Sequence, residues 1–576
     1  MIRVQNQPRE RRLLRVPETD HSHDIPHLVL VAAIAVALLA LGFYLRTLHP
    51  GVGPSLDSME LQIAAKVGGV IHPPGSPQYL MLGKLVMDLP LDGSAAYRLN
   101  LMSALCAAAM VGVLFLLTYR LTQNIVASSY VALTTAFAPR VWYQASIAEL
   151  YALNALYVAL VLYLLLAWHQ TQRRGFFWAA VIVYALSFGN HLSMILLLPA
   201  FLYVVEITDR SMLLRPRNLA LVLLIVLASA LQYLYIPIRV AANPPFCNYC
   251  PRVTGEGGGL AIGPLLDYMT GGPFKDQMFS LPRREVLARL PEASGLFARQ
   301  FLVWGMALGI VGGWELFRQR AEQAWMLVLA LLPQLIFVMT YAIPDWHDFM
   351  TPTYVIFAPL VGYGALRLWE VFQPQAEALL IRGRTLAGNA YPLALNLLAL
   401  LSVGVSLYAH YPLVDQSRQR DYEVNGRALL EQAQPGDWVL MPRPNSSQFY
   451  YSWAVRYLSL ADERLPYVTM VSTPEVDPPP GPSPAYLSWE EAEPQLTLDA
   501  LPELEVRVFV LERADDRVAG WGLLPVCTPD RDTIAGYELV AVLNSDQPVP
   551  LVDAERWARI ADAVVWDGME ARCPVE

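Results

Sequence analysis

Long apolar runs separated by short polar segments fill the first 410 residues of this chain. Most of the runs reach the roughly 20 residues that a helix needs to cross a bilayer, and three are shorter. The pattern predicts an α-helical polytopic membrane protein with about 11 transmembrane helices. The predicted spans are residues 28–48, 97–119, 124–139, 148–168, 176–190, 191–208, 218–238, 297–317, 322–343, 352–371 and 388–410.

The runs 176–190 and 191–208 follow one another without a polar break, so one long tilted helix is the alternative to two spans. Arginines lie before the first of these runs, at 173–174, and after the second, between 210 and 217. Basic residues favour the cytoplasmic side, so both ends belong on one side and the chain must turn between them. The sequence FGNHLS at 188–193 supplies residues typical of a turn, which favours two spans.

Arginine placement also predicts which loops face the cytoplasm. Alternation of the spans puts these residues inside: Arg120, Arg173, Arg174, Arg210, Arg215, Arg217, Arg318, Arg320, Arg382 and Arg384. The transmembrane domain, residues 28–410, then has outer loops at 49–96 and 240–296, and residues 411–576 lie outside. The outer loop 240–296 contains arginines of its own, but long loops are translocated largely regardless of charge. Residues 1–27 form a basic cytoplasmic arm, and we expect the multi-pass protein in the plasma membrane.

Composition supports this picture and excludes one class of partner. Charged residues make up 16% of the chain, against about 25% in soluble domains, and the mean hydropathy is +0.36. The net charge of −9 is the sum of two different parts. Arginines lie at the helix ends of the first 410 residues, whereas residues 411–576 are acidic. Neither part has the basic stripe that a nucleic-acid-binding protein needs, so no nucleic acid is expected.

Residues 411–576 alternate strand-like and helix-like stretches, which predicts a small soluble α/β domain with a parallel sheet. The strands are expected at 436–442, 467–472 and 506–512, with a helix at 446–461 and a proline-rich loop at 474–494. The domain lacks a glycine-rich phosphate loop and a nucleophile elbow. It is therefore interpreted as an acceptor-binding or packing module rather than a second enzyme.

Four of the five cysteines form two pairs in parts predicted to be outside. Cys247 and Cys250 form a C-x-x-C in the second large outer loop, and Cys527 and Cys573 lie in the C-terminal domain. A single C-x-x-C is weak evidence for zinc. In an oxidising compartment each pair is expected to form a disulfide, while Cys106, inside a span, is expected to be a buried apolar residue.

Polar residues converge on the predicted outer face from four separate segments. They are Asp57, Glu60 and His72 in the first outer loop, Asn190 and His191 at an outer turn, Tyr235 and Arg239 at a helix end, and Asp345, His347 and Asp348 at another turn. Ionisable groups at such depth are costly unless they face a cavity or a partner. Their coincidence at one face predicts a functional site at the extracytoplasmic surface.

Each of these groups also has a purely structural interpretation. Asp57 could cap a helix that starts near Ser58, with Glu60 as the acid of the first turn. His191 could bond a backbone carbonyl within the bundle. Arg239 could extend to the membrane interface, and residues 345–348 could form a solvated turn.

Six ordered stretches resemble one family of polytopic membrane proteins. They are LDSMELQIAAKVGGVIHPPGSPQYLMLGKL from 56, SIAELYALNALYVALVLYLLL from 146, LSFGNHLSMILLLP from 186, YLYIPIRVAANPP from 233, YMTGGPFKDQMF from 268 and YAIPDWHDFMTPTY from 341. The chain resembles, over roughly residues 28–370, the protein O-mannosyltransferase-like family of GT-C membrane glycosyltransferases. It departs from the family at FCNYCPRV, residues 246–253, where the family has a Trp-Gly-acidic stretch.

The resemblance implies transfer of a sugar from a polyprenyl-phosphate donor to an acceptor hydroxyl on the outer face, with an acid of the first outer loop as general base. The acceptor is a protein, lipid or glycan, and the eukaryotic relatives suggest mannose. Asp57 is then the expected base with Glu60 as helper or substitute, since residues three apart share a helix face. Arg239 is expected at the leaving phosphate. His72 and His191 would bond phosphate or sugar, and Asp345 and His347 would shape the pocket.

No compact ligand motif demands a metal, so neither a metal nor another cofactor is expected. Two other functions remain open alternatives. A transporter or flippase of lipid-linked glycans would place broken helices and ionisable groups near the middle of the bilayer, rather than at one face. A glycosidase also uses paired carboxylates, but it has little use for about 11 spans.

Overall fold

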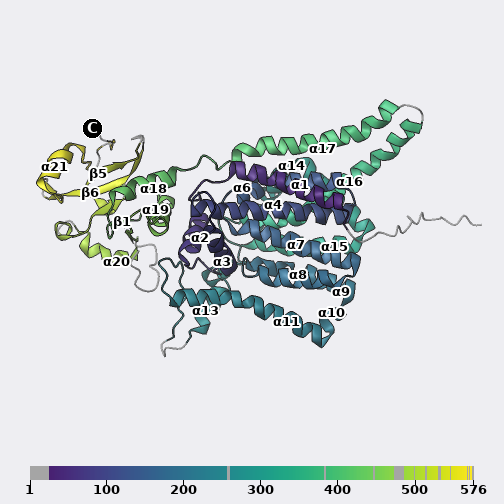
Figure 1. The fold of residues 1–576 in the computed structure, drawn as a ribbon, viewed down its shortest axis with the longest axis horizontal. Helices are drawn as coiled ribbons and strands as arrows, with labels where there is room; N and C mark the ends of the chain where they lie inside the picture. Colours follow the sequence, from purple (N-terminus) through teal and green to yellow (C-terminus); the bar gives the residue numbers. More distant parts are fainter. Residues whose placement is uncertain are drawn as a thin grey trace, which may run out of the picture.

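A helical bundle and a smaller α/β unit make up the protein, and they meet end to end in the computed structural model (Figure 1). The structure describes residues 25–573 apart from short gaps. The gaps are 256–259, 382–384, 445, 447, 473–485, 498–499, 513–515, 520, 530–532, 545–546, 567–568 and 570. The inside arginines predicted at 382 and 384 and most of the predicted basic arm lie outside the described residues.

The bundle contains all the predicted spans. They are α1 (His27–Thr47), α4 (Ala95–Thr122), α5 (Ile125–Ala136), α7 (Leu150–Thr171), α8 (Arg174–Ser187), η1–α9 (Leu192–Leu197 and Leu198–Asp209), α11–η2–α12 (Pro216–Ala230, Leu231–Leu234 and Tyr235–Ala241), α14 (Arg283–Gln319), α15 (Ala321–Thr340), α16 (Thr351–Ile381) and α17 (Thr385–Val414). In the described residues nine helical segments are long and apolar enough to cross a membrane, and α5 and α8 are shorter apolar helices. The prediction of a multi-pass helical membrane protein is confirmed.

The centre of the bundle is packed closely enough that glycines are needed where helices cross. A Cβ atom on Gly312 of α14 would lie 2.0 Å from the carbonyl oxygen of Leu360. A Cβ atom on Gly364 of α16 would lie 2.0 Å from the carbonyl oxygen of Leu308. Small residues at crossings let membrane helices approach closely. The two glycines therefore set the contact between α14 and α16.

The predicted inside loops meet at one end of the bundle. The Arg320 guanidinium donates to the carbonyl of Leu121 at 3.0 Å, and the Arg120 guanidinium donates to the Gln170 side chain at 3.3 Å. The opposite end carries the segments predicted to lie outside. They contain α2 (Leu56–Val67), α3 (Pro77–Met87), α6 (Pro139–Ser146), α13 (Ile262–Met269), η3 (Gly272–Gln277) and η4 (Asp348–Met350). Which end faces the cytoplasm stays a prediction.

The chain turns sharply between α8 and η1, as the flanking arginines predict. The backbone N–H of Gln78 donates to the carbonyl of Gly189 at 2.9 Å, which ties the turn to the start of α3. A Cβ atom on Gly189 would lie 2.3 Å from the side-chain oxygen of Gln232, so a larger residue would require the Gln232 side chain to move. Two separate helices are confirmed here, and the alternative of one tilted helix is wrong.

The C-terminal unit is a mixed sheet with helices around it. Its elements are α18 (Asp421–Gln432), β1 (Trp438–Leu440), α19 (Phe449–Ala461), β2 (Thr469–Val471), β3 (Tyr486–Leu487), α20 (Trp489–Ala492), β4 (Val508–Val510), β5 (Trp521–Cys527), β6 (Ile534–Asn544), β7 (Gln547–Pro550) and α21 (Ala554–Ile560), with short η5 (Glu493–Gln495), η6 (Leu501–Glu503), η7 (Asp516–Val518) and η8 (Ala561–Ala563). Strands β2, β1 and β4 are parallel, as predicted. The prediction of a loop at 474–494 is wrong at β3, which pairs with β2 in parallel, and at α20. Strands β6, β5 and β7 extend the sheet antiparallel. Both predicted disulfides, Cys247–Cys250 and Cys527–Cys573, are present.

The two parts of the molecule share a hydrophobic core around α2. Met59 and Ile63 of α2 belong to one buried cluster with Val455 and Leu458 of α19. The Arg456 guanidinium lies 4.7 Å from the centre of the Phe246 ring, a cation–π contact that adds to this junction. Helix α2 is therefore covered on one side by the bundle and on the other by the C-terminal unit.

Candidate active site

Helix α2 carries the two predicted catalytic acids, and Ser55 caps its N-terminus. The Ser55 hydroxyl accepts a hydrogen bond from the backbone N–H of Ser58 at 3.0 Å, the usual N-cap arrangement. The Ser58 hydroxyl donates to the carbonyl of Ala148 at 2.7 Å, which ties the helix to the segment before α7. The alternative in which Asp57 is the cap is therefore wrong, and the Asp57 carboxylate is not used in capping.

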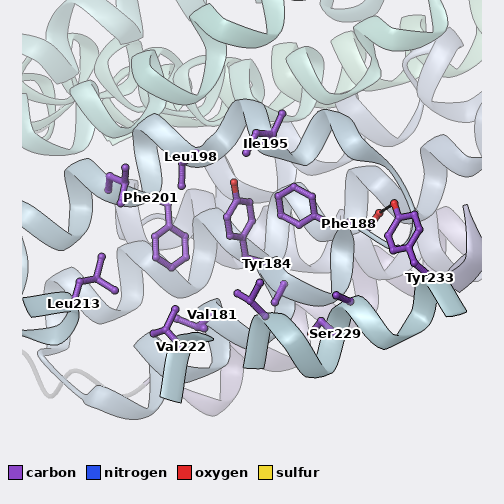
Figure 2. Close-up of a pocket in the computed structure, with 15 residues that line it drawn as sticks. Val181, Tyr184, Phe188, Ile195, Leu198, Phe201, Leu213, Val222, Ser229 and Tyr233 are labelled. Carbon is purple, nitrogen blue, oxygen red and sulfur yellow. Dashed lines mark hydrogen bonds between the residues drawn. The ribbon is translucent and has the colours of Figure 1, made fainter. Parts of the chain in front are cut away.

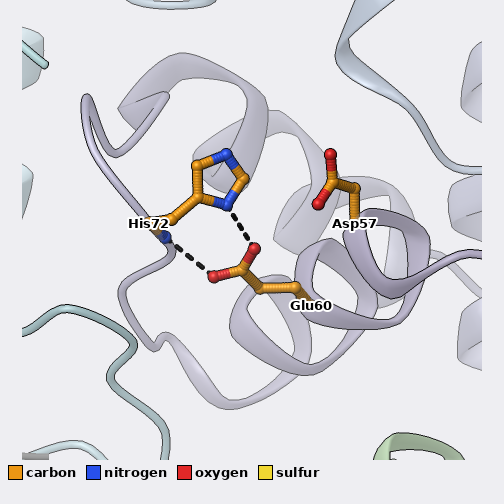
Figure 3. Close-up of side chains that lie close together, drawn as sticks. All are labelled: Asp57, Glu60 and His72. Atoms are coloured by element: carbon orange, nitrogen blue, oxygen red, sulfur yellow. Dashed lines mark hydrogen bonds and ion pairs between the residues drawn. The ribbon is translucent and has the colours of Figure 1, made fainter. Parts of the chain in front are cut away.

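Glu60 is buried and forms an ion pair with His72 (Figure 3). One carboxylate oxygen accepts the His72 ring Nδ1–H at 2.5 Å, and the other accepts the His72 backbone N–H at 2.7 Å. Burial alone would lower the pKa of His72, but the charge of Glu60 and its hydrogen bond raise this pKa to about 10. Burial alone would raise the pKa of Glu60, but the charge of His72 outweighs burial and lowers it. Both groups are thus ionised at neutral pH, and Glu60 is a poor proton acceptor.

Asp57 is half-buried and lies beside the imidazole of His72 (Figure 3). Burial raises the pKa of Asp57, the His72 charge opposes this, and the charges of Glu60 and Asp345 add to it, which brings the pKa to about 6. Among the described residues none donates a hydrogen bond to this carboxylate. Asp57 is therefore the α2 carboxylate that can take up a proton near neutral pH.

Glu149, directly before α7, is a further acid of the site that the sequence interpretation missed. Its carboxylate accepts a hydrogen bond from the Ser55 hydroxyl at 3.1 Å and is buried. Burial and the charge of Asp57 raise the pKa of Glu149 well above its usual value. The signal that could have revealed it is an acid at the start of an apolar run, which is costly without a partner.

The turn before α16 brings two predicted acids toward the same place. Asp348 accepts hydrogen bonds from Arg140 at 2.8 Å and from Gln144 at 2.6 Å, both on α6 and both missed from the sequence. Asp345 is close enough for its charge to raise the pKa of Asp57. His347 is turned aside, because its Nε2 bonds Glu292 at 2.7 Å.

Asn190 and His191 lie on the turn between α8 and η1, next to this group. The Asn190 side chain donates to the carbonyl of Leu150 at 3.3 Å and is fully buried. The His191 ring lies 5.7 Å from the ring of Tyr151 and 5.5 Å from that of Phe349, so three segments meet in one aromatic cluster. Burial, with the charge of His72 beside it, lowers the pKa of His191 to about 4, so this imidazole is neutral.

Tyr235 and Arg239 lie at the other end of α2. The Tyr235 hydroxyl donates to the carbonyl of Gly69 at 2.8 Å, and Arg239 donates to the carbonyls of Val67 and Gly68. Asp57 and Gly68 are separated by about 16 Å along the helix axis, at 1.5 Å per residue. The structure thus brings together predicted residues of the other three segments, apart from His347, whereas Tyr235 and Arg239 hold the end of α2.

An apolar groove begins beside this site and runs between α8, α9 and α11 (Figure 2). We call it the first groove; its volume is about 340 Å³. Phe188 and Tyr233 line one end, and Leu213 and Val222 line the opposite end. Gly189, which also lines the groove, accepts the backbone N–H of Gln78 of α3. Gly189 directly precedes Asn190 and His191, so the end of the groove at Phe188 lies next to the turn that carries them.

Three side chains of the site could supply ligands to a metal ion. Within the described residues, Asp57, Glu60 and His72 each offer one ligand atom, and these atoms lie within 4.8 Å of one another. Carboxylate and imidazole suit several divalent ions. The Glu60 carboxylate, however, already accepts three hydrogen bonds, two from His72 and one from Asn248 at 2.8 Å. The residues therefore fit an internal ion pair better than a metal centre.

Comparison with known proteins places these residues in a family context. Residues 57–213 match the family model "Protein O-mannosyl-transferase TMEM260 N-terminal domain". Protein O-mannosyl-transferase TMEM260 of Mus musculus is 32% identical over 192 residues, 32% of this chain and 27% of the mouse protein. The homologous protein of Dictyostelium discoideum is 27% identical over 123 residues, 21% of this chain and 15% of that protein. The chain spans about a quarter or less of the length of these relatives, and the resemblance indicated by the motifs is confirmed for this region.

The fold has a counterpart among solved structures. The crystal structure of ArnT from Cupriavidus metallidurans, bound to undecaprenyl phosphate, has a TM-score of 0.57 with 14% sequence identity. The match covers 88% of this chain and 97% of ArnT. The likeness confirms the GT-C fold for the chain.

Proposed function

We propose that this protein is a GT-C-type glycosyltransferase that moves a sugar from a polyprenyl-phosphate donor to an acceptor hydroxyl at the extracytoplasmic face. The fold and the family match of residues 57–213 support this class of reaction. The curated relatives are named protein O-mannosyl-transferases, which favours mannose as the sugar and a protein hydroxyl as the acceptor, with lipid or glycan acceptors as alternatives. The solved relative carries undecaprenyl phosphate, which favours a lipid-phosphate donor.

The observation that carries the proposal is the contrast between the two acids of α2. Asp57 is half-buried with a pKa of about 6, whereas Glu60 is held ionised by His72. A general base works best when its pKa lies near the working pH. Asp57 accepts the proton of the acceptor hydroxyl as its oxygen attacks the anomeric carbon. The bond from that carbon to the phosphate oxygen breaks, and its electron pair leaves with polyprenyl phosphate.

His72 supplies positive charge for the leaving phosphate. Its Nδ1 is bonded to Glu60, which leaves Nε2–H as the donor that faces away from Glu60 (Figure 3). The pKa of about 10 keeps this ring charged at neutral pH. A fixed charge aimed at developing negative charge is a large contribution to catalysis. Asp345 adds negative charge around Asp57, which suits the positive character of a sugar carbon that is losing its leaving group.

The hydrocarbon chain of the donor lies in the first groove. Apolar side chains line this groove (Figure 2), and one of its lining residues, Gly189, lies two positions before His191. Exposed Ile195, Leu202 and Val226 border it, so a chain can enter from the lipid phase. Each methylene of the lipid chain that is buried in the groove contributes about 0.8 kcal/mol to the binding free energy of the donor.

The proposed location is the plasma membrane, with the site and the C-terminal unit outside. Two disulfides support an oxidising compartment for the segments that contain them. Asp345 and His347 remain proposed pocket residues, and Arg239 remains a proposed donor-binding residue. The contacts of Arg239 with the end of α2 add no support for its role at the same phosphate as His72.

The test is sugar transfer by the purified protein in detergent, where transport across a membrane cannot occur. We expect release of polyprenyl phosphate from a polyprenyl-phosphate mannose donor in the presence of a hydroxyl acceptor. Asp57→Asn should lower turnover by about 10²–10⁴-fold, the usual contribution of a general base. Asp92→Asn, an exposed acid of the same outer loop, is the matched control and should retain full turnover. Full activity of Asp57→Asn would refute its role, and donor-dependent transport by a protein without transferase activity would favour a flippase.

A further inference from the structure

The loop closed by the Cys247–Cys250 disulfide contacts Glu60, one of the two acids of α2. The side-chain amide of Asn248, between the two cysteines, donates to the Glu60 carboxylate at 2.8 Å. This contact joins residues 188 positions apart in the sequence. The loop also lies in the stretch 246–253, where the sequence departs from the family.

Backbone contacts fix the position of this loop against the segment before His72. The Val70 N–H donates to the carbonyl of Phe246 at 3.1 Å, and the Asn248 N–H donates to the carbonyl of Val70 at 2.9 Å. A Cβ atom on Gly69 would lie 2.4 Å from the Phe246 carbonyl oxygen, so only glycine permits this approach. Residues 69–70 and 246–248 are therefore held in a fixed alignment with each other.

Asn248 completes the set of donors around Glu60. One Glu60 oxygen accepts both the His72 backbone N–H and the Asn248 amide, and the other accepts the His72 ring. With the first oxygen held by two donors, the carboxylate cannot rotate without breaking hydrogen bonds to a charged group, which are the stronger kind. The second oxygen is thereby aimed at the His72 ring.

The same loop also supports His72 through aromatic side chains. The Tyr249 ring lies 5.8 Å from the Phe274 ring, and the Phe274 ring lies 5.9 Å from the His72 ring, both edge to face. The disulfide joins the residues on either side of Asn248 and Tyr249, and so limits the conformations of both. Both members of the ion pair are thus in contact with elements that this loop positions.

We propose that Asn248 is a positioning residue of the transferase, and that the Cys247–Cys250 disulfide holds it where it fixes Glu60 and thereby orients His72 toward the donor phosphate. This inference rests on the proposed function. Loss of the Asn248 amide frees Glu60 to rotate, and His72 then loses the partner that keeps it charged. The groups that face His72 are Glu60 and Asp57 from α2, Glu149 from the segment before α7, and the neutral His191.

The experiment compares Asn248→Ala and Asn248→Asp with the unaltered chain. Asn248→Asp keeps the size of the side chain but removes the donor and adds a like charge beside Glu60, so a space-filling role would be preserved and a donor role lost. We expect both variants to lower kcat about 10-fold with little change in KM, because the lost interaction acts in the transition state. In Asn248→Ala the basic limb of the pH–rate profile should move down by about one pH unit, since one hydrogen bond to a charged pair is lost.

The disulfide is tested by the double variant Cys247→Ser/Cys250→Ser, with Cys527→Ser/Cys573→Ser as the matched control. The first should behave like Asn248→Ala and the second like the unaltered chain. In the control variant Cys247–Cys250 is the remaining disulfide among the described residues. A dithiol should reduce it to two thiols, being itself oxidised to a cyclic disulfide, and should reproduce the same shift.

Hydrogen exchange of the His72 backbone N–H, which donates to Glu60, gives a readout that needs no sugar transfer. It should be faster in both Asn248 variants and in Cys247→Ser/Cys250→Ser. Unchanged exchange, or an Asn248→Asp variant with the pH profile of the unaltered chain, would overturn the positioning role. If the unaltered chain transfers no sugar from any donor, the proposed function fails, and the exchange rates still decide whether Asn248 fixes Glu60.

Discussion

Two apolar grooves lie between the helices of the bundle, and they differ in what surrounds their ends. The first groove, between α8, α9 and α11, has a volume of about 340 Å³ and ends at the turn that carries His191. A second groove, between α5, α14, α16 and α17, is larger, at about 590 Å³. Its polar atoms satisfy one another, since Trp304 donates to Ser402 at 2.7 Å and Tyr130 lies 3.3 Å from the same hydroxyl.

The comparison teaches that volume alone does not identify a substrate site. Among the described residues, no acid, histidine or basic residue lines either groove. The second groove is lined by Leu366 and Leu368, which flank Arg367, and this arginine is already paired with Glu370. The first groove is smaller, but it is lined by Gly189, two positions before His191, and we expect a lipid chain within it to present its head group toward that turn. An apolar groove is a candidate donor site when a few polar or charged groups lie at its end.

Filling each groove in turn is the change with the largest expected effect on this comparison. Ala185→Phe inserts a ring into the first groove and should raise KM for a long-chain donor about 10-fold, because displacing about two methylenes costs about 1.5 kcal/mol. Ala399→Phe in the second groove is the matched control and should leave KM unchanged. Initial rates at varied donor concentration give the measurement.

Donor chain length separates this explanation from general damage. A donor with only two or three isoprene units does not fill the first groove, so Ala185→Phe should use it as well as the unaltered chain does. Equal losses with short and long donors would mean that the substitution distorts the protein. A raised KM in Ala399→Phe would instead identify the second groove as the donor site.

A smaller effect is expected when the charge around Asp57 is reduced. The base works deprotonated, so kcat/KM should fall as the pH drops through about 6, the pKa of Asp57. The negative charge of Asp345 raises that pKa, so Asp345→Asn should move the acidic limb to lower pH, by about half a unit. Asp267→Asn, an exposed acid paired with Lys275, is the control. A limb that stays in place in Asp345→Asn would show that a different group titrates.

The smallest effect is expected from removing divalent cations. Glu60 and His72 already satisfy each other, so a chelator such as EDTA should change turnover by less than about twofold. The matched measurement is the pH profile with and without added Mg²⁺ or Mn²⁺. A large loss that an added cation restores would mean that Asp57, Glu60 and His72 bind a metal, and that the first groove leads to a metal centre.

The arrangement of the helices could be predicted from the sequence because the bilayer imposes length and polarity on each span. Even the two short spans, at α5 and α8, were found by apolar runs and by arginines at their ends. The C-terminal sheet was predicted only in part. Its parallel strands lie between helical stretches and could be identified, whereas β5, β6 and β7 are joined to one another by hydrogen bonds that no local pattern in the sequence reveals.

The site could be predicted as a set of segments but not as a set of contacts. Topology places Asp57 and Arg239 at the same end of the bundle, but it does not say that α2 lies between them. Glu149 was missed because it lies at the start of an apolar run. Asn248 was missed because the C-x-x-C that contains it was interpreted through its two cysteines alone. The bond from Asn248 to Glu60 spans 188 positions and depends on how the two loops pack.

The junction around α2 has a consequence for how the molecule can be divided. The C-terminal unit packs against Met59 and Ile63 of α2. We expect a chain truncated after α17 to expose these apolar side chains to water. Helix α2, which carries the two acids, should then be less well ordered. A displacement of the C-terminal unit would therefore reach α2, which carries Asp57, through the side chains that the two parts share.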